Sequence, residues 1–256
     1  MLTTIAAAIL FTAYGAAAQV CQGYGPQTPR DISSLAGANE RLFALAPSSA
    51  KMNLCNIHTH TNAEHKGPGF SIFAGAGANG GYQCGGADGL TEAELTDPAG
   101  DDGAFKGAKP GETIEVHWVF SSCDVAPGEG LGACLSDQCA NPQLRVEAQV
   151  FLVVNDPDAA DFSDYAYRGE AVGGLHQPKA LPFGGEPVVF AGSTTGPSYT
   201  EAKCSPLQVT WSVRPNCARV DISSLHEWAK ANPFNEKKSH GVRQLVTSPE
   251  LLAPID

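Results

Sequence analysis

The stretch Glu112-Thr-Ile-Glu-Val-His-Trp-Val-Phe-Ser121 predicts a β-strand whose two faces differ. Successive side chains of a strand point to opposite faces, so residues two apart share a face. Glu115, His117 and Val119 therefore lie together. The other face carries only apolar side chains, those of Ile114, Val116, Trp118 and Phe120. We expect the apolar face to be buried, which makes the face with Glu115 and His117 the unusual one.

Five further segments carry strand signals, namely residues 53–60, 144–155, 186–191, 207–213 and 242–247. Glycine-rich stretches such as 67–88 and 98–110 sustain no period and are expected to form loops. One short helix is predicted, with Ser223 or Ser224 as its N-cap and its end before Pro233. We expect a mainly β protein, a β-rich α+β fold that is loop-rich with few short helices.

The composition of the 256 residues fits this fold class and excludes others. With 43% hydrophobic residues the chain can bury a sizeable core, which argues against intrinsic disorder. The 28 glycines and 18 prolines favour a fold rich in turns. Asp and Glu number 27 against 16 Lys and Arg, and the basic residues do not cluster, which argues against a nucleic-acid partner.

Residues 1–18 have the character of a secretory signal peptide. They carry no charge, run apolar from Ile5 to Phe11 and end in three alanines. The apolar run is shorter than the roughly 20 residues that span a bilayer, and small residues mark a cleavage site after Ala18. We expect an exported protein, periplasmic or secreted, with no membrane attachment after cleavage.

Export changes the expected role of the eight cysteines. In an oxidising compartment an even number of cysteines indicates disulfide bonds, and a zinc–thiolate site is the minority alternative. Cys134 and Cys139 could close a small loop, but the sequence does not decide among the many possible pairings.

Histidine is scarce, with seven in the chain, yet four of them fall in two compact motifs. His58 and His60 are two residues apart on a predicted strand, so both project from one face. Paired with the strand of His117, they would place three imidazoles around a point with a fourth position open to water, as in catalytic zinc sites. The plain alternative is the polar face of a solvated sheet.

Two further residues near these motifs have expected supporting roles. Glu115 precedes His117 by two residues and is placed to accept the N–H of a ligating histidine, which fixes the tautomer of that ring. His65 stands before a Gly-Pro-Gly turn and faces away from His58 and His60 by parity. We expect His65 to be a structural hydrogen-bonding residue and not a ligand.

These motifs resemble those of the carbonic anhydrases. The order of the motifs H-x-H, E-H and E-x-H is similar to that of the α class. The sequences around them, CNIHTHTNAEHKGPG and GETIEVHWVFSSCD, are closer to the δ class and its bacterial relatives. Farther along, residues 197–204 and then Val209-Thr210-Trp211 resemble the α-class segment S-L-T-T-P-P and its V-x-W strand. The similarity spans residues 55–211, most of the chain after the signal peptide.

The resemblance implies a zinc enzyme that hydrates CO₂ reversibly to bicarbonate and a proton through a zinc-bound hydroxide. Its Zn²⁺ would be bound by His58, His60 and His117, and Glu115 would support one of these ligands. The implied fold is a single catalytic domain, residues 19–256, on a large, mostly antiparallel sheet similar to that of the α-class enzymes. The implied partner is a small molecule, CO₂ or bicarbonate.

The resemblance also implies which residues surround the reacting molecule. Glu64 would orient the hydroxyl of Thr200, which accepts a hydrogen bond from the hydroxide, and Val119 and Trp211 would wall an apolar pocket for CO₂. Two departures stand out. Glu64 and Glu115 are separated by a long glycine-rich insertion that the α class lacks. The second threonine and both prolines of the α-class segment are replaced by Glu201, Ala202 and Lys203.

Two other functions fit parts of the pattern. The spacing His58-x-His60-x-x-x-Glu64 matches the first metal motif of the cupins, oxygenases and isomerases that use Fe, Mn or other ions, and Glu64 would then be a direct ligand. A non-catalytic exported module that binds zinc is the other alternative. The residue that takes up the released proton is left open among three histidines, His176, His226 and His240.

Overall fold

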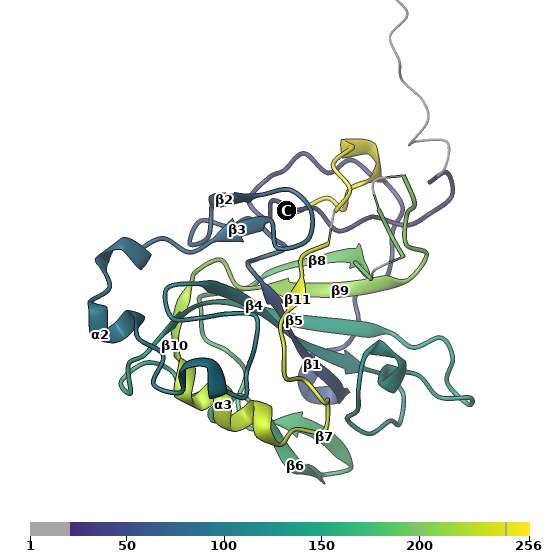
Figure 1. Ribbon diagram of the computed structural model, residues 1–256. Coiled ribbons are helices and arrows are strands. Elements are labelled where there is room, and N and C mark those ends of the chain that lie inside the picture. Colours follow the sequence, from purple (N-terminus) through teal and green to yellow (C-terminus); the bar gives the residue numbers. More distant parts are fainter. Residues whose placement is uncertain (1–20, 197, 201, 244) are drawn as a thin grey trace, which may run out of the picture.

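Figure 1 shows the computed structural model of the chain, which describes residues 21–196, 198–200, 202–243 and 245–256. The signal peptide expected over residues 1–18 lies outside the described residues. Within them, no helix combines the length and the apolar character needed to cross a membrane.

A seven-stranded sheet forms the centre of the described fold, in the order β11-β1-β4-β5-β9-β8 with β10 also beside β5. The strands are β1 (Asn53–Thr61), β4 (Thr113–Ser121), β5 (Leu144–Val154), β8 (Val188–Ser193), β9 (Gln208–Val213), β10 (Ala218–Asp221) and β11 (His240–Gly241). Five of the six predicted strands are therefore confirmed, with small shifts at their ends.

The sheet is mixed. The antiparallel pairs are β1 with β4, β4 with β5 and β8 with β9, and these are the longest pairings. The pairs β5 with β9, β5 with β10 and β1 with β11 are parallel. The expected β-rich fold on a large sheet with few helices is confirmed, and its antiparallel pairings dominate by length.

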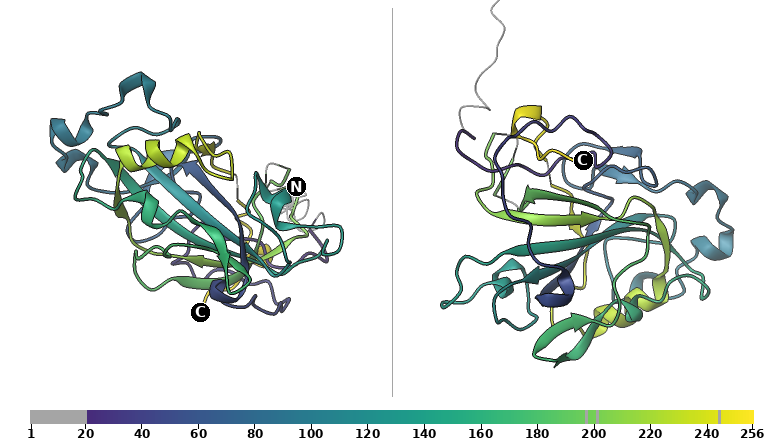
Figure 2. Two further views of the ribbon diagram at one scale, coloured as in Figure 1. Left: turned by 90° about the horizontal axis from the view of Figure 1, so that it is seen from below. Right: turned by 180° about the vertical axis from the view of Figure 1, so that it is seen from behind.

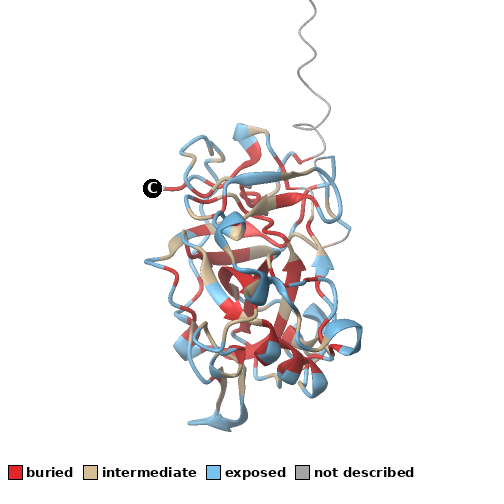
Figure 3. Ribbon diagram, turned by 60° about the vertical axis from the view of Figure 1, so that its left-hand side comes forward, coloured by how far each residue is buried: buried red, intermediate tan, exposed pale blue. Residues whose placement is uncertain are grey.

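The two faces of the sheet bury different side chains. One face carries the apolar residues of β4 and packs against the helix α3 (Ile222–Lys230), where Trp228 joins the core. Figure 2 shows α3 lying across this side of the sheet. The other face packs Val119 and Trp211 into a second core and carries the polar residues of β4. Figure 3 shows the strands as the buried centre, with exposed loops around them.

Helix α3 begins earlier than predicted. Its N-cap is Asp221, whose side chain accepts a hydrogen bond from Ser224 N, so the prediction of a serine cap is wrong. Aspartate caps a helix as well as serine does, and because Asp221 also ends β10 the strand passes directly into the helix. The predicted end before Pro233 is confirmed, since the helix ends at Lys230.

The remaining elements lie outside the main sheet. The insertion between β1 and β4 forms a hairpin of β2 (Ile72–Gly75) and β3 (Gly81–Gln83) and the short helix α2 (Glu92–Leu95). A second hairpin pairs β6 (Tyr167–Val172) with β7 (Leu175–Pro178). Single 3-10 turns are η1 (Ser49–Lys51), η2 (Ala87–Gly89), η3 (Gly100–Asp102), η4 (Leu131–Cys134), η5 (Phe162–Asp164) and η6 (Pro249–Leu251). The hairpins are largely exposed, so no apolar alternation marked them in the sequence.

The strand predicted over residues 242–247 is wrong, because the described residues of this segment have no strand. The chain forms β11 beside the end of β1 and then leaves the sheet. β1 itself ends there, since the next residue, Asn62, adopts a left-handed conformation with φ 63°. Val242, Leu245 and Val246 are nevertheless buried, which accounts for the apolar pattern.

The eight cysteines form four disulfide bonds, Cys21–Cys204, Cys55–Cys134, Cys84–Cys217 and Cys123–Cys139. The expected disulfide framework is confirmed, but the small loop between Cys134 and Cys139 is not formed because each pairs elsewhere. The bond from Cys55 to Cys134 ties η4 to β1, the strand that carries two of the histidines.

Candidate metal centre

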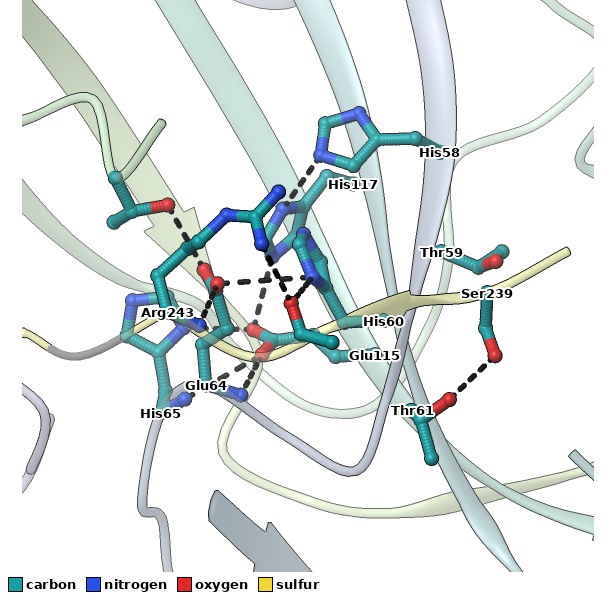
Figure 4. Close-up of polar contacts among 12 residues, drawn as sticks. His58, Thr59, His60, Thr61, Glu64, His65, Glu115, His117, Ser239 and Arg243 are labelled. Carbon is teal, nitrogen blue, oxygen red and sulfur yellow. Dashed lines mark hydrogen bonds and ion pairs between the residues drawn. The ribbon is translucent and has the colours of Figure 1, made fainter. Parts of the chain in front are cut away.

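Three histidines from two neighbouring strands converge on one point. His58 and His60 lie on β1, and His58 stands directly opposite His117 in the antiparallel pair with β4. One nitrogen of each ring lies within 4.8 Å of the corresponding nitrogens of the other two. His117 Nδ1 and His58 Nε2 are 3.2 Å apart, and Figure 4 shows the rings pointing toward one another. The fold thus brings together the three histidines that the sequence singled out.

The second nitrogen of each ring faces an acceptor. The three contacts are His58 Nδ1 to Asn56 Oδ1 at 2.7 Å, His60 Nδ1 to Gly241 O at 3.3 Å and His117 Nε2 to Glu115 Oε1 at 3.2 Å. An acceptor holds the ring proton on its own side, so the opposite nitrogen presents a lone pair. The nitrogens that can offer a lone pair to a metal are therefore His58 Nε2, His60 Nε2 and His117 Nδ1. Three oriented imidazoles suit a divalent transition metal.

Burial and neighbouring charges decide the protonation of the three rings. Burial lowers the pKa of His58 well below its usual value, and the neighbouring His117 and His60 lower it further. Burial also lowers the pKa of His60, which Glu64 only partly offsets. His117 differs, because burial lowers its pKa but the adjacent Glu115 carboxylate outweighs burial and raises it. His58 and His60 therefore favour the neutral form that a metal requires, whereas the Glu115 carboxylate favours the protonated form of His117.

Glu115 is fully buried and connects the histidines to the turn after β1. Its Oε1 lies 2.7 Å from His65 Nδ1, and its Oε2 accepts a hydrogen bond from Glu64 N at 2.6 Å. Burial would raise the pKa of Glu115, but His65 and His117 lower it well below the usual range. His65, Glu115 and His117 form a second group whose ligand atoms lie close enough together to hold a metal ion. In that group, Glu115 Oε1 lies 2.7 Å from His65 Nδ1 and 3.2 Å from His117 Nε2.

Glu64 is also fully buried, and it holds a hydroxyl at the edge of the site. Its Oε2 accepts a hydrogen bond from Thr195 Oγ1 at 3.0 Å, and its Oε1 accepts one from Arg243 N at 2.7 Å. Burial raises the pKa of Glu64, but His60 and His117 outweigh burial and lower it. An ionised carboxylate can only accept hydrogen bonds, so Thr195 must be the donor.

The predicted contact between Glu64 and Thr200 is absent, and Thr195 takes its place. Thr200 is exposed, its backbone pairs with Lys203, and its side chain does not line the cavity of the histidines. The structure therefore gives Glu64 a different hydroxyl partner from the one that the resemblance implies. The run Ser193-Thr-Thr-Gly-Pro197 holds two adjacent threonines and, one residue later, a proline, which is a sequence signal that could have pointed to Thr195.

The histidines lie in the wall of a cavity of about 490 Å³. One side of the cavity is apolar and includes Val119, Leu144, Val146, Val209 and Trp211. The two predicted pocket residues are among them, and the ring centroid of Trp211 lies 5.2 Å from that of His117. The other side is polar and includes Glu236, His240 and Arg243. The three histidines therefore line a cavity that has both an apolar wall and a polar wall.

Of the three histidines left open for proton uptake, only His240 lines this cavity. Its ring centroid is 6.1 Å from that of His60, and its Nε2 lies 3.0 Å from Glu236 Oε2. His226 is buried on α3 against Asp97, and His176 contacts Tyr167 in the second hairpin.

Sequence reasoning missed Asn56, Gly241 and Arg243 as well as Thr195. Asn56 shares its parity with the two histidines of β1, so the alternation of side chains could have placed it on the same face. Gly241 and Arg243 lie at the far end of the chain. No local pattern connects them to β1, and only the pairing of β11 with β1 brings them there.

Comparison with known proteins identifies the family. Residues 49–224, which include both ligand strands, match the delta carbonic anhydrase family. Among solved structures, the chain is similar to an alpha-carbonic anhydrase from Photobacterium profundum at 16% identity and a TM-score of 0.30, with 95% of this chain and 97% of that chain covered.

The chain is also similar to the alpha-carbonic anhydrase from Thermovibrio ammonificans in complex with the inhibitor sulfanilamide. The identity is 13% and the TM-score 0.28, with 91% of this chain and 92% of that chain covered. No curated protein matches the chain. The family match covers well over half of the sequence, so the chain belongs to the delta carbonic anhydrase family and is a carbonic anhydrase.

Proposed function

We propose that this carbonic anhydrase hydrates CO₂ reversibly to bicarbonate and a proton with one Zn²⁺ held by His58, His60 and His117. The observation that carries the proposal is the convergence of three oriented imidazoles within 4.8 Å at the wall of a half-apolar cavity. Zinc, when bound, supplies a nucleophile at neutral pH because it lowers the pKa of water to about 7.

Thr195 is the residue that we assign to orienting the reacting oxygen. Its hydroxyl has one proton, which it donates to the ionised Glu64, so toward the cavity it can only accept a hydrogen bond. A reacting oxygen that still carries a proton can donate to Thr195 and is held in one orientation. Fixing the nucleophile in this way lowers the entropic cost of reaching the transition state.

The apolar wall suits CO₂, which is uncharged. Val119 is buried, and the indole Nε1 of Trp211 is already committed to Ser193 O at 3.0 Å, so neither side chain offers a hydrogen bond to the cavity. CO₂ gains from contact with this surface, whereas the bicarbonate anion loses hydration against it. The wall therefore favours the substrate of hydration over its product.

The cupin alternative requires Glu64 as a direct metal ligand. Both carboxylate oxygens of Glu64 are already hydrogen-bonded, to Thr195 and to Arg243 N, and Glu64 is not part of the converging group. The alternative of a non-catalytic zinc module predicts the same metal site without turnover. Measured CO₂ hydration by the zinc-loaded protein would exclude it, and bound zinc without turnover would support it.

We further propose that residues 1–18 are a signal peptide and that residues 19–256 form the catalytic domain outside the cytoplasm. Four disulfide bonds support this location, because such bonds persist in oxidising compartments. Sequencing the N-terminus of the protein recovered from an expressing cell tests the proposal, and a mature chain that starts at Met1 would contradict it.

Stopped-flow CO₂ hydration by zinc-loaded protein tests the proposed reaction. We expect catalysis well above the buffer rate, its loss on chelation, and its recovery with added Zn²⁺. His117→Ala should abolish it, whereas the matched control His176→Ala, which alters a histidine away from the cavity, should retain it. A wild-type rate equal to buffer, or an active His117→Ala protein, would refute the proposal.

A further inference from the structure

Arg243 is a basic residue beside the three histidines, and the proposed reaction does not use its side chain. Its backbone is fixed on both sides, because Arg243 N donates to Glu64 Oε1 at 2.7 Å and Arg243 O accepts from Arg30 Nη2 at 2.7 Å. These two bonds do not involve its guanidinium. The position of the residue is therefore set by its backbone and does not depend on the contacts of its guanidinium.

The guanidinium of Arg243 lines the same cavity as His58, His60 and His117. Figure 4 shows the side chain extending from the segment after β11 toward His60 and His117. Its Nη1 donates to Gly241 O at 3.3 Å, the carbonyl that His60 Nδ1 also faces. A fixed positive charge therefore stands on the polar wall of the cavity, within reach of a molecule that occupies it.

Arg243 differs from three arginines of the chain that pair with carboxylates. Arg145 and Arg214 share the carboxylate of Glu147, and Arg219 pairs with Asp156 at 3.1 Å. Among the residues that the structure describes, no carboxylate forms an ion pair with Arg243. A guanidinium has five N–H donors in a planar fork, and the one hydrogen bond that the guanidinium of Arg243 makes to the described residues is that to Gly241 O. The remaining donors are available to a ligand.

We propose that Arg243 forms an anion subsite that binds bicarbonate, the product of hydration and the substrate of dehydration. This inference rests on the proposed function. Bicarbonate is a planar anion with three oxygens, and a guanidinium fork can donate two parallel hydrogen bonds to such a group. CO₂ has no charge and gains no comparable bond. The subsite therefore acts on the anion, opposite the apolar wall that suits CO₂.

The test compares Arg243→Gln and Arg243→Lys with the wild type, all loaded with zinc. The first measurement is inhibition of CO₂ hydration by added bicarbonate. We expect Arg243→Gln to weaken bicarbonate inhibition by about tenfold, as the loss of a charge-assisted hydrogen bond predicts, with the KM for CO₂ changed far less. Arg243→Lys keeps the charge but loses the fork, so it should fall between the two.

Lys237→Gln is the matched control, because it removes one positive charge from the exposed rim of the same cavity. Rim charges are screened by water, so bicarbonate inhibition should change by less than about twofold. Equal zinc content and equal thermal unfolding of the variants would show that the fold is kept. An unchanged inhibition constant in Arg243→Gln, or an equal effect of Lys237→Gln, would overturn the proposal.

A binding measurement separates this inference from the proposed function. Bicarbonate and nitrate are titrated into the cobalt-substituted protein and followed by the visible spectrum of the metal, with no turnover required. We expect both anions to bind about tenfold more weakly to Arg243→Gln. An inactive wild type that still shows this loss would refute the reaction but keep the subsite. An active enzyme with equal anion binding in both proteins would refute the subsite alone.

Discussion

The strand residues and the loop residues of the site are positioned in different ways. On β1 and β4 the regular alternation of side chains and the register of the pair place His58 opposite His117, with no loop involved. The segment after β8 and the segment after β11 have no such repeat. They are positioned by individual hydrogen bonds, chiefly those of Thr195 Oγ1 and Arg243 N to Glu64. We propose that the strand residues bind the metal and that the loop residues act on the molecule beside it.

This difference predicts that substitutions in the strands and substitutions in the loops impair the enzyme in different ways. A change in the strands should remove the metal or weaken its binding, whereas a change in the loops should leave the metal bound and slow or redirect the reaction. Each prediction below tests that division.

Thr195→Val should have the largest effect among the loop and support residues. The substitution keeps the shape of the side chain but removes the donor to Glu64 and the acceptor toward the cavity. We expect kcat/KM for CO₂ to fall by about a hundredfold, as loss of a positioned polar group in a buried site does. Zinc content should stay at one per chain, and a loss of zinc would break the division.

Glu115→Gln should weaken the strand half of the site. Glu115 holds Nε2 of His117, and loss of such a support costs about ten- to a hundredfold in metal affinity. Competition with a chelator at pH 8 measures the zinc affinity, with Glu170→Gln as a matched control that alters an exposed glutamate outside the cavity. An unchanged affinity would show that Glu115 does not act through the metal.

The pH dependence of zinc binding sharpens the same point. Glu115 raises the pKa of His117 above its usual value, and zinc can bind only the deprotonated ring. Zinc affinity should therefore fall as pH falls through this raised pKa, by up to about tenfold per pH unit for one displaced proton. In Glu115→Gln the fall should move to lower pH, because the carboxylate that stabilises the imidazolium is gone. Chelator titrations between pH 5 and pH 8 would reveal an unmoved profile as a contradiction.

Thr200→Val should have the smallest effect. Thr200 is exposed and paired with Lys203, away from the cavity, so kcat/KM for CO₂ should change by less than about twofold. A loss as large as that of Thr195→Val would mean that the segment after β8 rearranges in the working enzyme.

The strand residues of the site were predictable from the sequence, whereas the loop residues were not. The strand over 112–121 was predictable because one face carries only apolar side chains and the other carries Glu115 and His117, which gives the sequence a period of two. The same period places His58 and His60 on one face of the strand over 53–60. The hydroxyl partner of Glu64 was assigned to Thr200 instead of Thr195, because a loop has no period that sets a register. The strand expected over 242–247 failed for a related reason, since the described apolar residues of this segment are buried without forming a strand.

The most direct test of the account is the position of the metal in a crystal of the zinc-loaded protein, located by anomalous scattering at the zinc edge. We predict one zinc ion bound by His58 Nε2, His60 Nε2 and His117 Nδ1 at about 2.0–2.1 Å from each nitrogen, with the fourth position directed to the cavity. A zinc ion held by His65, Glu115 and His117, or one bound directly by Glu64, would contradict it.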